Sequence, residues 1–167
     1  VTAELTRDDG PAVTFAGYKL DVPAQVMEDK PGLAGYIGKK VILGIRPSDF
    51  DDASLAPRDR GTMAVTAGVT EELGSEINVI FTIDAPHVEH AFIAQATETS
   101  EDEDEATAAL IGGKSLWTAR VSKESRVKNG TTLELSVDTR YLQFFDPDSG
   151  LSIGHPKASA AVADQSA

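Results

Sequence analysis

Ile77-Asn78-Val79-Ile80-Phe81-Thr82-Ile83 is the stretch that decides the fold class, because large apolar side chains occupy every second position. Ile77, Val79 and Phe81 fall on one face of an extended chain. This period of two is typical of a β-strand with one buried face. The stretch therefore predicts a strand that covers a hydrophobic core.

Further strand signals lie on both sides of this stretch. Residues 13–22 predict a hairpin with Ala16-Gly17 at its tip, and residues 41–45 predict a buried strand that ends before Pro47. The remaining predicted strands are 62–73, 116–121, 133–137 and 141–145, with turns at Gly74-Ser75, Asn129-Gly130 and 146–150. Helix is predicted only around 31–37 and 101–111. Seven or eight short strands favour a barrel or sandwich over βαβ units.

Composition limits the function classes. The chain has 167 residues, which suggests one domain or two small ones, and a net charge of −12 argues against a nucleic-acid partner. No apolar run is long enough to span a membrane, and the absence of cysteine excludes disulfides and thiolate metal sites. No signal peptide is apparent. The first residue is Val1 rather than Met, so we expect the sequence to be a piece of a longer protein.

Half of the net charge comes from six carboxylates within residues 98–105. Such blocks are usually solvated loops or first helical turns. The last residues, 154–167, are small and polar and predict a flexible tail.

Three short motifs resemble functional sites but lack essential parts. The stretch that ends at Gly113-Lys114-Ser115 matches a loosened phosphate loop, but a predicted helix precedes it and a strand follows, the reverse of the required order. His87 and His90 lack a third metal ligand at a useful spacing. Residues 146–157 lack the glutamate that closes a calcium loop. We therefore expect no metal, no cofactor and no catalysis by this chain.

Three blocks resemble the C-terminal regulatory domain of maltose-type sugar ABC importer ATPases. They are Val41-Ile42-Leu43-Gly44-Ile45-Arg46-Pro47-Ser48-Asp49-Phe50, Glu71-Glu72-Leu73-Gly74-Ser75-Glu76, and a closing block from Val127 to Val137-Asp138 followed by Leu142, Phe145-Asp146 and Gly150. The blocks occur in the family's order at about its spacing. The family usually carries Glu where Ser48 stands, so a contact made by that carboxylate is altered or shifted to Asp49.

The resemblance implies a mainly β fold, an OB-like barrel with extra strands of the TOBE type and one or two short helices. It implies a discontinuous domain over residues 1–153 with an acidic insertion at about 98–113, and an ATPase domain, with its ATP and Mg²⁺, outside this sequence. The implied role is regulation and homodimerisation of the ATP-binding subunit. Its partners would be that ATPase domain, indirectly the membrane subunits, and a regulatory protein, at the cytoplasmic face of the membrane.

The resemblance also selects eight residues as interface or regulatory candidates: Arg46, Pro47, Ser48, Asp49, Leu73, Gly74, Glu76 and Asp146. Arg46 is expected to pair with a carboxylate near a domain junction. The large apolar side chains at strand spacing are expected in the core, namely Val79, Phe81, Trp117, Phe144 and Phe145. Since Phe144 and Phe145 must face opposite ways, one of them is a candidate for an interface.

The residues alone leave two other functions possible. One is a stand-alone barrel that binds a small oxyanion or a sugar. The other is a secreted carbohydrate-binding β-domain, against which the absence of a signal peptide and of cysteine, and the presence of a single Trp, count.

Overall fold

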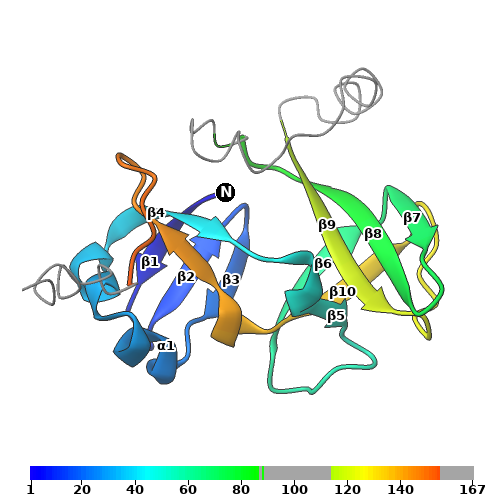
Figure 1. Ribbon diagram of the computed structural model, residues 1–167, viewed down its shortest axis with the longest axis horizontal. Helices are drawn as coiled ribbons and strands as arrows, with labels where there is room; N and C mark the ends of the chain where they lie inside the picture. The colour runs from blue at the N-terminus through cyan, green and yellow to red at the C-terminus, as the bar shows by residue number, and fades with distance from the viewer. Residues whose placement is uncertain (87, 89–113, 155–167) are drawn as a thin grey trace, which may run out of the picture.

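The computed structural model describes residues 1–86, 88 and 114–154, and its strands form three antiparallel sheets (Figure 1). The largest sheet has five strands in the order β11-β4-β1-β2-β3. Their bounds are Gln143–Phe145 for β11, Lys39–Gly44 for β4, Thr2–Thr6 for β1, Ala12–Phe15 for β2 and Tyr18–Asp21 for β3. The last described strand, β11, thus returns to pair with β4.

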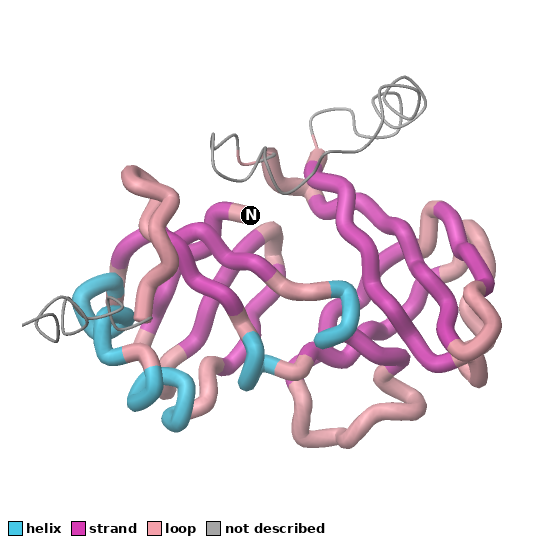
Figure 2. Tube along the Cα trace, in the orientation of Figure 1, coloured by secondary structure: helices cyan, strands magenta, loops and turns pink. Residues whose placement is uncertain are grey.

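Two short helices cover one end of this sheet (Figure 2). The helix α1, Ala24–Asp29, is followed at once by the 3-10 helix η1, Pro31–Tyr36. Each helix inserts one apolar side chain, since Val26 and Leu33 are buried. The predicted helix at 31–37 is confirmed as a 3-10 helix, whereas α1 was not predicted. The predicted helix at 101–111 lies outside the described residues.

The other two sheets have three strands each. One has the order β5-β10-β6, with bounds Phe50–Asp52, Thr132–Val137 and Gly61–Thr66. The other has the order β7-β8-β9, with bounds Val69–Glu72, Glu76–Ile83 and Ser115–Ser122. We call these six strands the barrel unit.

The barrel unit is joined along both sides of its two sheets. On one side β6 and β7 are separated only by Ala67 and Gly68, where the Gly68 N–H bonds the Ile80 carbonyl at 2.8 Å. A Cβ at Gly68 would lie 3.1 Å from that carbonyl oxygen, so glycine permits the close approach. On the other side β9 lies next to β5, and the Ser122 N–H donates to Asp51 Oδ1 at 3.3 Å. The two sheets are thus joined on both sides but remain separate in their strand pairing, and the mainly β, OB-like fold class is confirmed.

One hydrophobic core runs through the five-stranded sheet and the barrel unit. The predicted alternation in β8 is confirmed, because Ile77, Val79, Phe81 and Ile83 are buried while the residues between them are more exposed. Trp117 links the two parts: its ring lies 6.0 Å from the Phe15 ring of the five-stranded sheet and 6.2 Å from the Phe50 ring of β5. Trp117 is nevertheless only half-buried.

Several predicted turns and strand ends can be compared with the structure. The hairpin tip at Ala16-Gly17 is confirmed, and both residues have positive φ values of 47° and 83°. The turn at Asn129-Gly130 is confirmed, but it does not connect two paired strands of a hairpin. Residue 127 is not in a strand, and β9 and β10 belong to different sheets. The turn instead leads the chain from one sheet to the other.

The last strand is shorter than predicted. It covers Gln143–Phe145, because the 3-10 helix η4, Thr139–Tyr141, occupies the start of the predicted range. Phe144 is in the core with 1% exposure, and Phe145 is half-buried on the opposite face, where a Cβ at Gly44 would lie 3.5 Å from its ring. The opposite orientation of the two rings is thus confirmed.

Candidate functional site

The eight candidate residues lie in three separate places in the fold. Residues 46–49 follow β4 where the chain leaves the five-stranded sheet. Leu73, Gly74 and Glu76 form the tip of the β7–β8 hairpin in the barrel unit. Asp146 follows β11, beside the helices at the far end of the five-stranded sheet. The structure therefore does not gather the candidates into one site.

The first place is the junction between the five-stranded sheet and the barrel unit. The chain passes between them twice, through the 3-10 helix η2, Pro47–Asp49, and through η4 (Figure 2). The two passages are hydrogen-bonded, since the Asp138 N–H donates to the Asp49 carbonyl at 2.8 Å. We call Arg46, Asp49, Arg60, Asp138 and Arg140 the lobe junction.

Asp138 is the charged centre of the lobe junction. Its side chain is 10% exposed and accepts from Arg140 through Nε at 2.8 Å and Nη2 at 2.6 Å. Arg60 adds an ion pair at 3.1 Å to Oδ2. The Arg140 hydrogen bond, with the charges of both arginines, lowers the pKa of Asp138 below its ordinary range, and burial opposes the shift. A bidentate guanidinium of this kind fixes the direction of the carboxylate.

Asp49 has the opposite environment. Its Oδ2 atom is buried and has no hydrogen-bond partner among the described residues. Burial raises the pKa of Asp49, the nearby Asp138 charge adds to the rise, and Arg46 opposes it. Arg46 and Ser48 are exposed, and within the described ranges Arg46 forms no ion pair. The arginines that pair at the junction are thus Arg60 and Arg140.

Sequence reasoning did not select Arg60, Asp138 or Arg140. Asp138 stood in the third family block, directly after the buried Val137. A polar residue at the end of a buried strand is a signal for a junction, but its partners Arg60 and Arg140 lie in loops and a single-turn helix without periodic pattern.

The second place is the tip of the β7–β8 hairpin. Gly74 has a φ of +85°, which a glycine adopts without strain, and the Leu73 N–H closes the turn on the Glu76 carbonyl at 2.8 Å. Glu76 also pairs with Arg120 of β9 at 3.4 Å. Leu73 itself is 53% exposed. The tip thus presents an apolar side chain to solvent on a rigid turn.

The third place is the turn after β11. Asp146 accepts hydrogen bonds from the backbone N–H groups of Asp148 and Ser149 at 2.9 and 2.7 Å, and from the Tyr36 hydroxyl at 2.5 Å. These bonds, with the Tyr36 bond contributing most, lower the pKa of Asp146 to about 2. Asp146 therefore fastens the turn to η1, which is a structural role.

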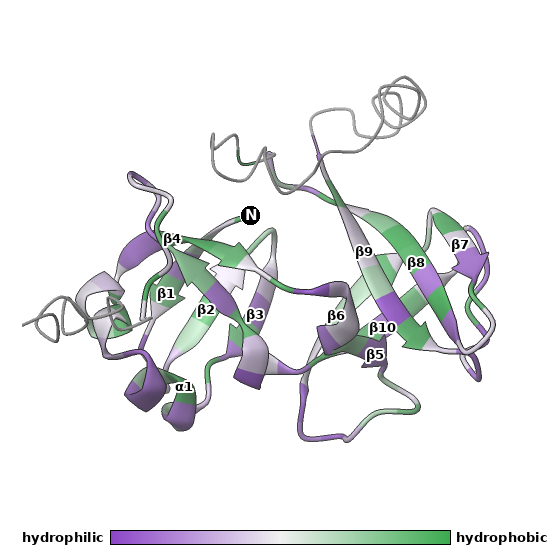
Figure 3. Cartoon of the chain, viewed as in Figure 1, coloured by the Kyte–Doolittle hydropathy of each residue, from purple (hydrophilic) through white to green (hydrophobic). Residues whose placement is uncertain are grey.

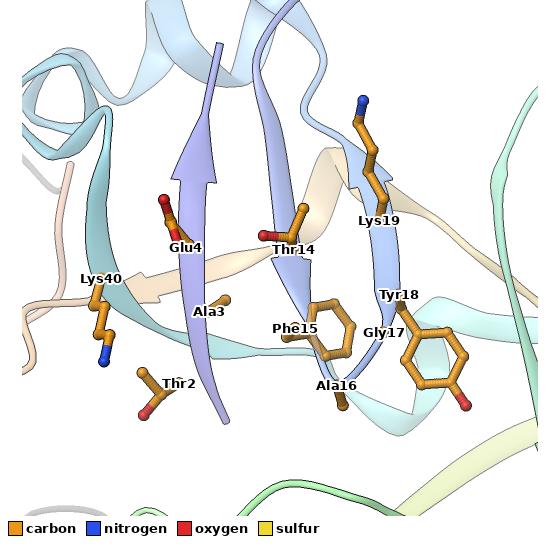
Figure 4. A pocket seen from close by; sticks show the side chains of 10 residues that line it. All are labelled: Thr2, Ala3, Glu4, Thr14, Phe15, Ala16, Gly17, Tyr18, Lys19 and Lys40. Atoms are coloured by element: carbon orange, nitrogen blue, oxygen red, sulfur yellow. The ribbon is translucent and has the colours of Figure 1, made fainter. Parts of the chain in front are cut away.

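An open hollow of about 540 Å³ lies over the five-stranded sheet near the β2–β3 turn. Lys40, Glu4, Thr14 and Lys19 are cross-strand neighbours on β4, β1, β2 and β3, and they form a polar row along one face of the sheet (Figure 4). The row offers two ammonium groups, a carboxylate and a hydroxyl, which are groups that can bind a polyhydroxy compound or a small anion.

Within the described part of the chain, no cluster of three or more His, Asp and Glu side chains could hold a metal ion. His87 and His90 lie outside the described residues. Among the described helices none has the length and apolar character needed to cross a bilayer.

Comparison with known proteins bears on the same regions. The family described as the MalK OB fold domain matches residues 1–50, which cover β1 to β4 and η2. The chain is also 34% identical over 122 residues to the trehalose import ATP-binding protein SugC of two Mycobacterium tuberculosis strains, CDC 1551 / Oshkosh and H37Rv. This match covers 71% of the chain, which spans 29% of the length of these relatives. These matches confirm the resemblance found in the sequence: the chain is similar to the MalK OB fold domain over residues 1–50 and to SugC over 71% of its length.

Proposed function

We propose that this chain is a non-catalytic regulatory and dimerisation domain of the ATP-binding subunit of a sugar ABC importer. The observation that carries the proposal is the MalK OB fold match over residues 1–50 together with the similarity to SugC. The parent subunit would be a transport ATPase that binds ATP and Mg²⁺ in another domain. The transported substrate would be a sugar, the class to which the trehalose in the relatives' name belongs.

The packing of the chain supports such a role. A domain that holds two subunits together must transmit force without changing its own shape. The two hydrogen-bonded passages at the lobe junction, the buried Asp138 with two arginines, and the aromatic contacts of Trp117 all resist relative motion of the sheet and the barrel unit. A permanent contact between two such domains would make closure of the ATPase domains intramolecular.

The proposed partners follow from this role. They are a second copy of the chain, the ATPase domain of the same subunit, indirectly the membrane subunits, and a regulatory protein. The place of action would be the cytoplasmic face of the membrane. A regulator would have to bind one separation of the paired domains more tightly than another, because equal affinity shifts no equilibrium.

Two assays test the proposal. Sedimentation over a wide concentration range should show a dimer. An ATPase assay of this chain should show no turnover, and turnover that is abolished by Lys114→Ala would contradict the non-catalytic role.

A second function is favoured by one specific observation, the polar row Lys40, Glu4, Thr14 and Lys19 beside the open hollow. Barrels of the OB class bind oligosaccharides on a strand face. Calorimetry with trehalose, maltose, molybdate and tungstate separates the two functions. Tight one-to-one binding that is lost in Lys40→Ala would favour a binding module over a dimerisation domain.

A further inference from the structure

The turn between β9 and β10 carries the only Asn-Gly pair of the sequence, Asn129-Gly130. The Thr131 N–H closes this turn on the Lys128 carbonyl at 3.1 Å, and Gly130 adopts a φ of 79°. Asn129 and Gly130 are both exposed. A backbone nitrogen attacks the preceding asparagine side chain most readily when it belongs to glycine, because no side chain shields it. The turn therefore presents a chemically reactive pair to solvent.

This turn is fastened to the passage between β6 and β7. Asn129 Oδ1 accepts two hydrogen bonds from Thr70 of β7, one from the backbone N–H and one from the hydroxyl, both at 2.8 Å. The Gly130 N–H donates to the Ala67 carbonyl at 2.7 Å, and the Ala67 N–H donates to the Thr131 carbonyl at 2.9 Å. Figure 3 shows β7 largely in purple, the colour of hydrophilic residues. We call these four hydrogen bonds the turn anchor.

The turn anchor holds both groups that would react with each other. Loss of the side-chain amide begins when the Gly130 nitrogen gives its proton to hydroxide and attacks Cγ of Asn129. In the folded chain the proton of that nitrogen is bound to Ala67, and the side-chain carbonyl of Asn129 is bound to Thr70. A backbone N–H in such a bond loses its proton only after local opening. The reaction should therefore proceed only from the fraction of chains in which the turn is open.

We propose that Asn129 is a deamidation site gated by the turn anchor. In the opened turn a bond forms between the Gly130 nitrogen and Cγ of Asn129. The bond from Cγ to Nδ2 breaks, and the nitrogen leaves as ammonia after it takes a proton from water. A second water then opens the succinimide ring at one of its two carbonyls and leaves aspartate or isoaspartate in place of Asn129. This inference goes beyond the proposed function and does not depend on it.

The two products should affect the barrel unit differently. Aspartate keeps a side-chain oxygen that accepts hydrogen bonds from Thr70. Isoaspartate passes the main chain through the side-chain carbon, which adds one atom to the backbone before Gly130. The bonds to Thr70 and Ala67 then no longer fit the same turn. Since the turn anchor joins this turn to the β6–β7 passage, formation of isoaspartate should loosen that side of the barrel unit.

The experiment ages the whole chain, labelled with ¹⁵N, at neutral pH and physiological temperature. A synthetic peptide of residues 125–133 is aged beside it, because it carries the reactive pair without the turn anchor. Mass spectrometry of proteolytic fragments follows conversion of Asn129, and NMR measures hydrogen exchange of the Gly130 N–H. We expect the folded chain to deamidate at least about tenfold more slowly than the peptide, since each hydrogen bond contributes about 1 kcal/mol. This factor should equal the protection of the Gly130 N–H from exchange.

Two matched variants test the gate. Thr70→Val removes the hydroxyl donor but keeps the branched shape and the backbone N–H. It should speed deamidation and exchange of the Gly130 N–H by the same factor of about five. Thr62→Val is the control, because Thr62 is an exposed threonine of β6 outside the turn anchor, and it should change neither rate.

The products test the consequence for the barrel unit. The isoaspartate form, isolated from the aged chain, should exchange the Thr70 and Ala67 N–H groups at least about tenfold faster than the unmodified chain. The Asn129→Asp variant should retain most of the protection at both groups.

Three results would overturn the proposal. Deamidation of the folded chain at the rate of the peptide would show that the turn anchor does not gate the reaction. Slower deamidation in Thr70→Val would show that the hydroxyl activates the amide instead of holding it. A deamidation rate in the folded chain that does not follow the exchange of the Gly130 N–H would show that the reaction does not pass through the opened turn.

Discussion

The backbone N–H of Asp138 donates a 2.8 Å hydrogen bond to the carbonyl oxygen of Asp49, and this bond joins the two passages between the five-stranded sheet and the barrel unit. The side-chain carboxylates of the same two residues differ in environment. Asp138 is satisfied by two arginines, whereas Asp49 has a buried oxygen without a partner among the described residues. Stability and pH response at the junction should therefore change in opposite directions when each residue is altered.

Replacement of Asp138 by asparagine should destabilise the chain. The variant loses both ion pairs and leaves Arg60, which is 27% exposed, without its partner. Because Arg140 is largely solvated, its ion pair contributes little to stability. We expect the variant to lose about 1–2 kcal/mol in the free energy of unfolding. Urea unfolding measures it, with the exposed Asp9→Asn as the control. Equal stability of the two variants would mean that the ion pairs do not hold the junction.

Replacement of Asp49 by asparagine should stabilise the chain at neutral pH. Burial raises the pKa of Asp49, so the folded state binds a proton more readily than the unfolded state does. The native residue therefore contributes most stability below its ordinary pKa of 3.8 and loses this contribution as the pH rises through the raised value. Asparagine carries no charge at any pH. The variant should melt at a higher temperature at pH 7, and the gain should disappear near pH 3.

A gain for Asp49→Asn that persists at pH 3 would show that the charge of Asp49 is not the cause. A loss at pH 7 would show that the carboxylate makes a contact that asparagine cannot make. Asp9→Asn again serves as the control.

Replacement of Tyr36 by phenylalanine should raise the pKa of Asp146. The Tyr36 hydroxyl is the largest contributor to the pKa of about 2 at this carboxyl. A lowered carboxyl pKa adds stability above the unfolded value of 3.8, and that stability is lost as the pH falls toward 2. Carbon-detected NMR titration should show the Asp146 carboxyl titrating at higher pH in the variant. An unchanged titration would assign the shift to the Ser149 amide and hydroxyl and the Asp148 amide instead.

The elements with a clear period could be predicted from the sequence, and single-turn elements could not. The alternation from Ile77 to Ile83 and the apolar run from Val41 to Leu43 each specify a buried strand, because every second side chain of the first and every side chain of the second is buried. The helix α1 has six residues, buries only Val26 and has no side-chain cap, so no local signal marks it. Its position depends on packing against the five-stranded sheet.

The candidate site residues also divide into those with a local sequence signal and those without one. The family blocks led to the strand ends and turns at Pro47, Gly74 and Asp146, since these are features of local sequence. They did not lead to the ion pairs of Asp138 with Arg60 and Arg140, because the chain folds these residues together from separate loops. A charge pair between distant segments leaves no pattern in a single sequence.

Sedimentation velocity of this chain across micromolar to millimolar concentration tests the central claim most directly. The account predicts a species of twice 17.7 kDa. A single species of 17.7 kDa at the highest concentration would contradict a dimerisation domain.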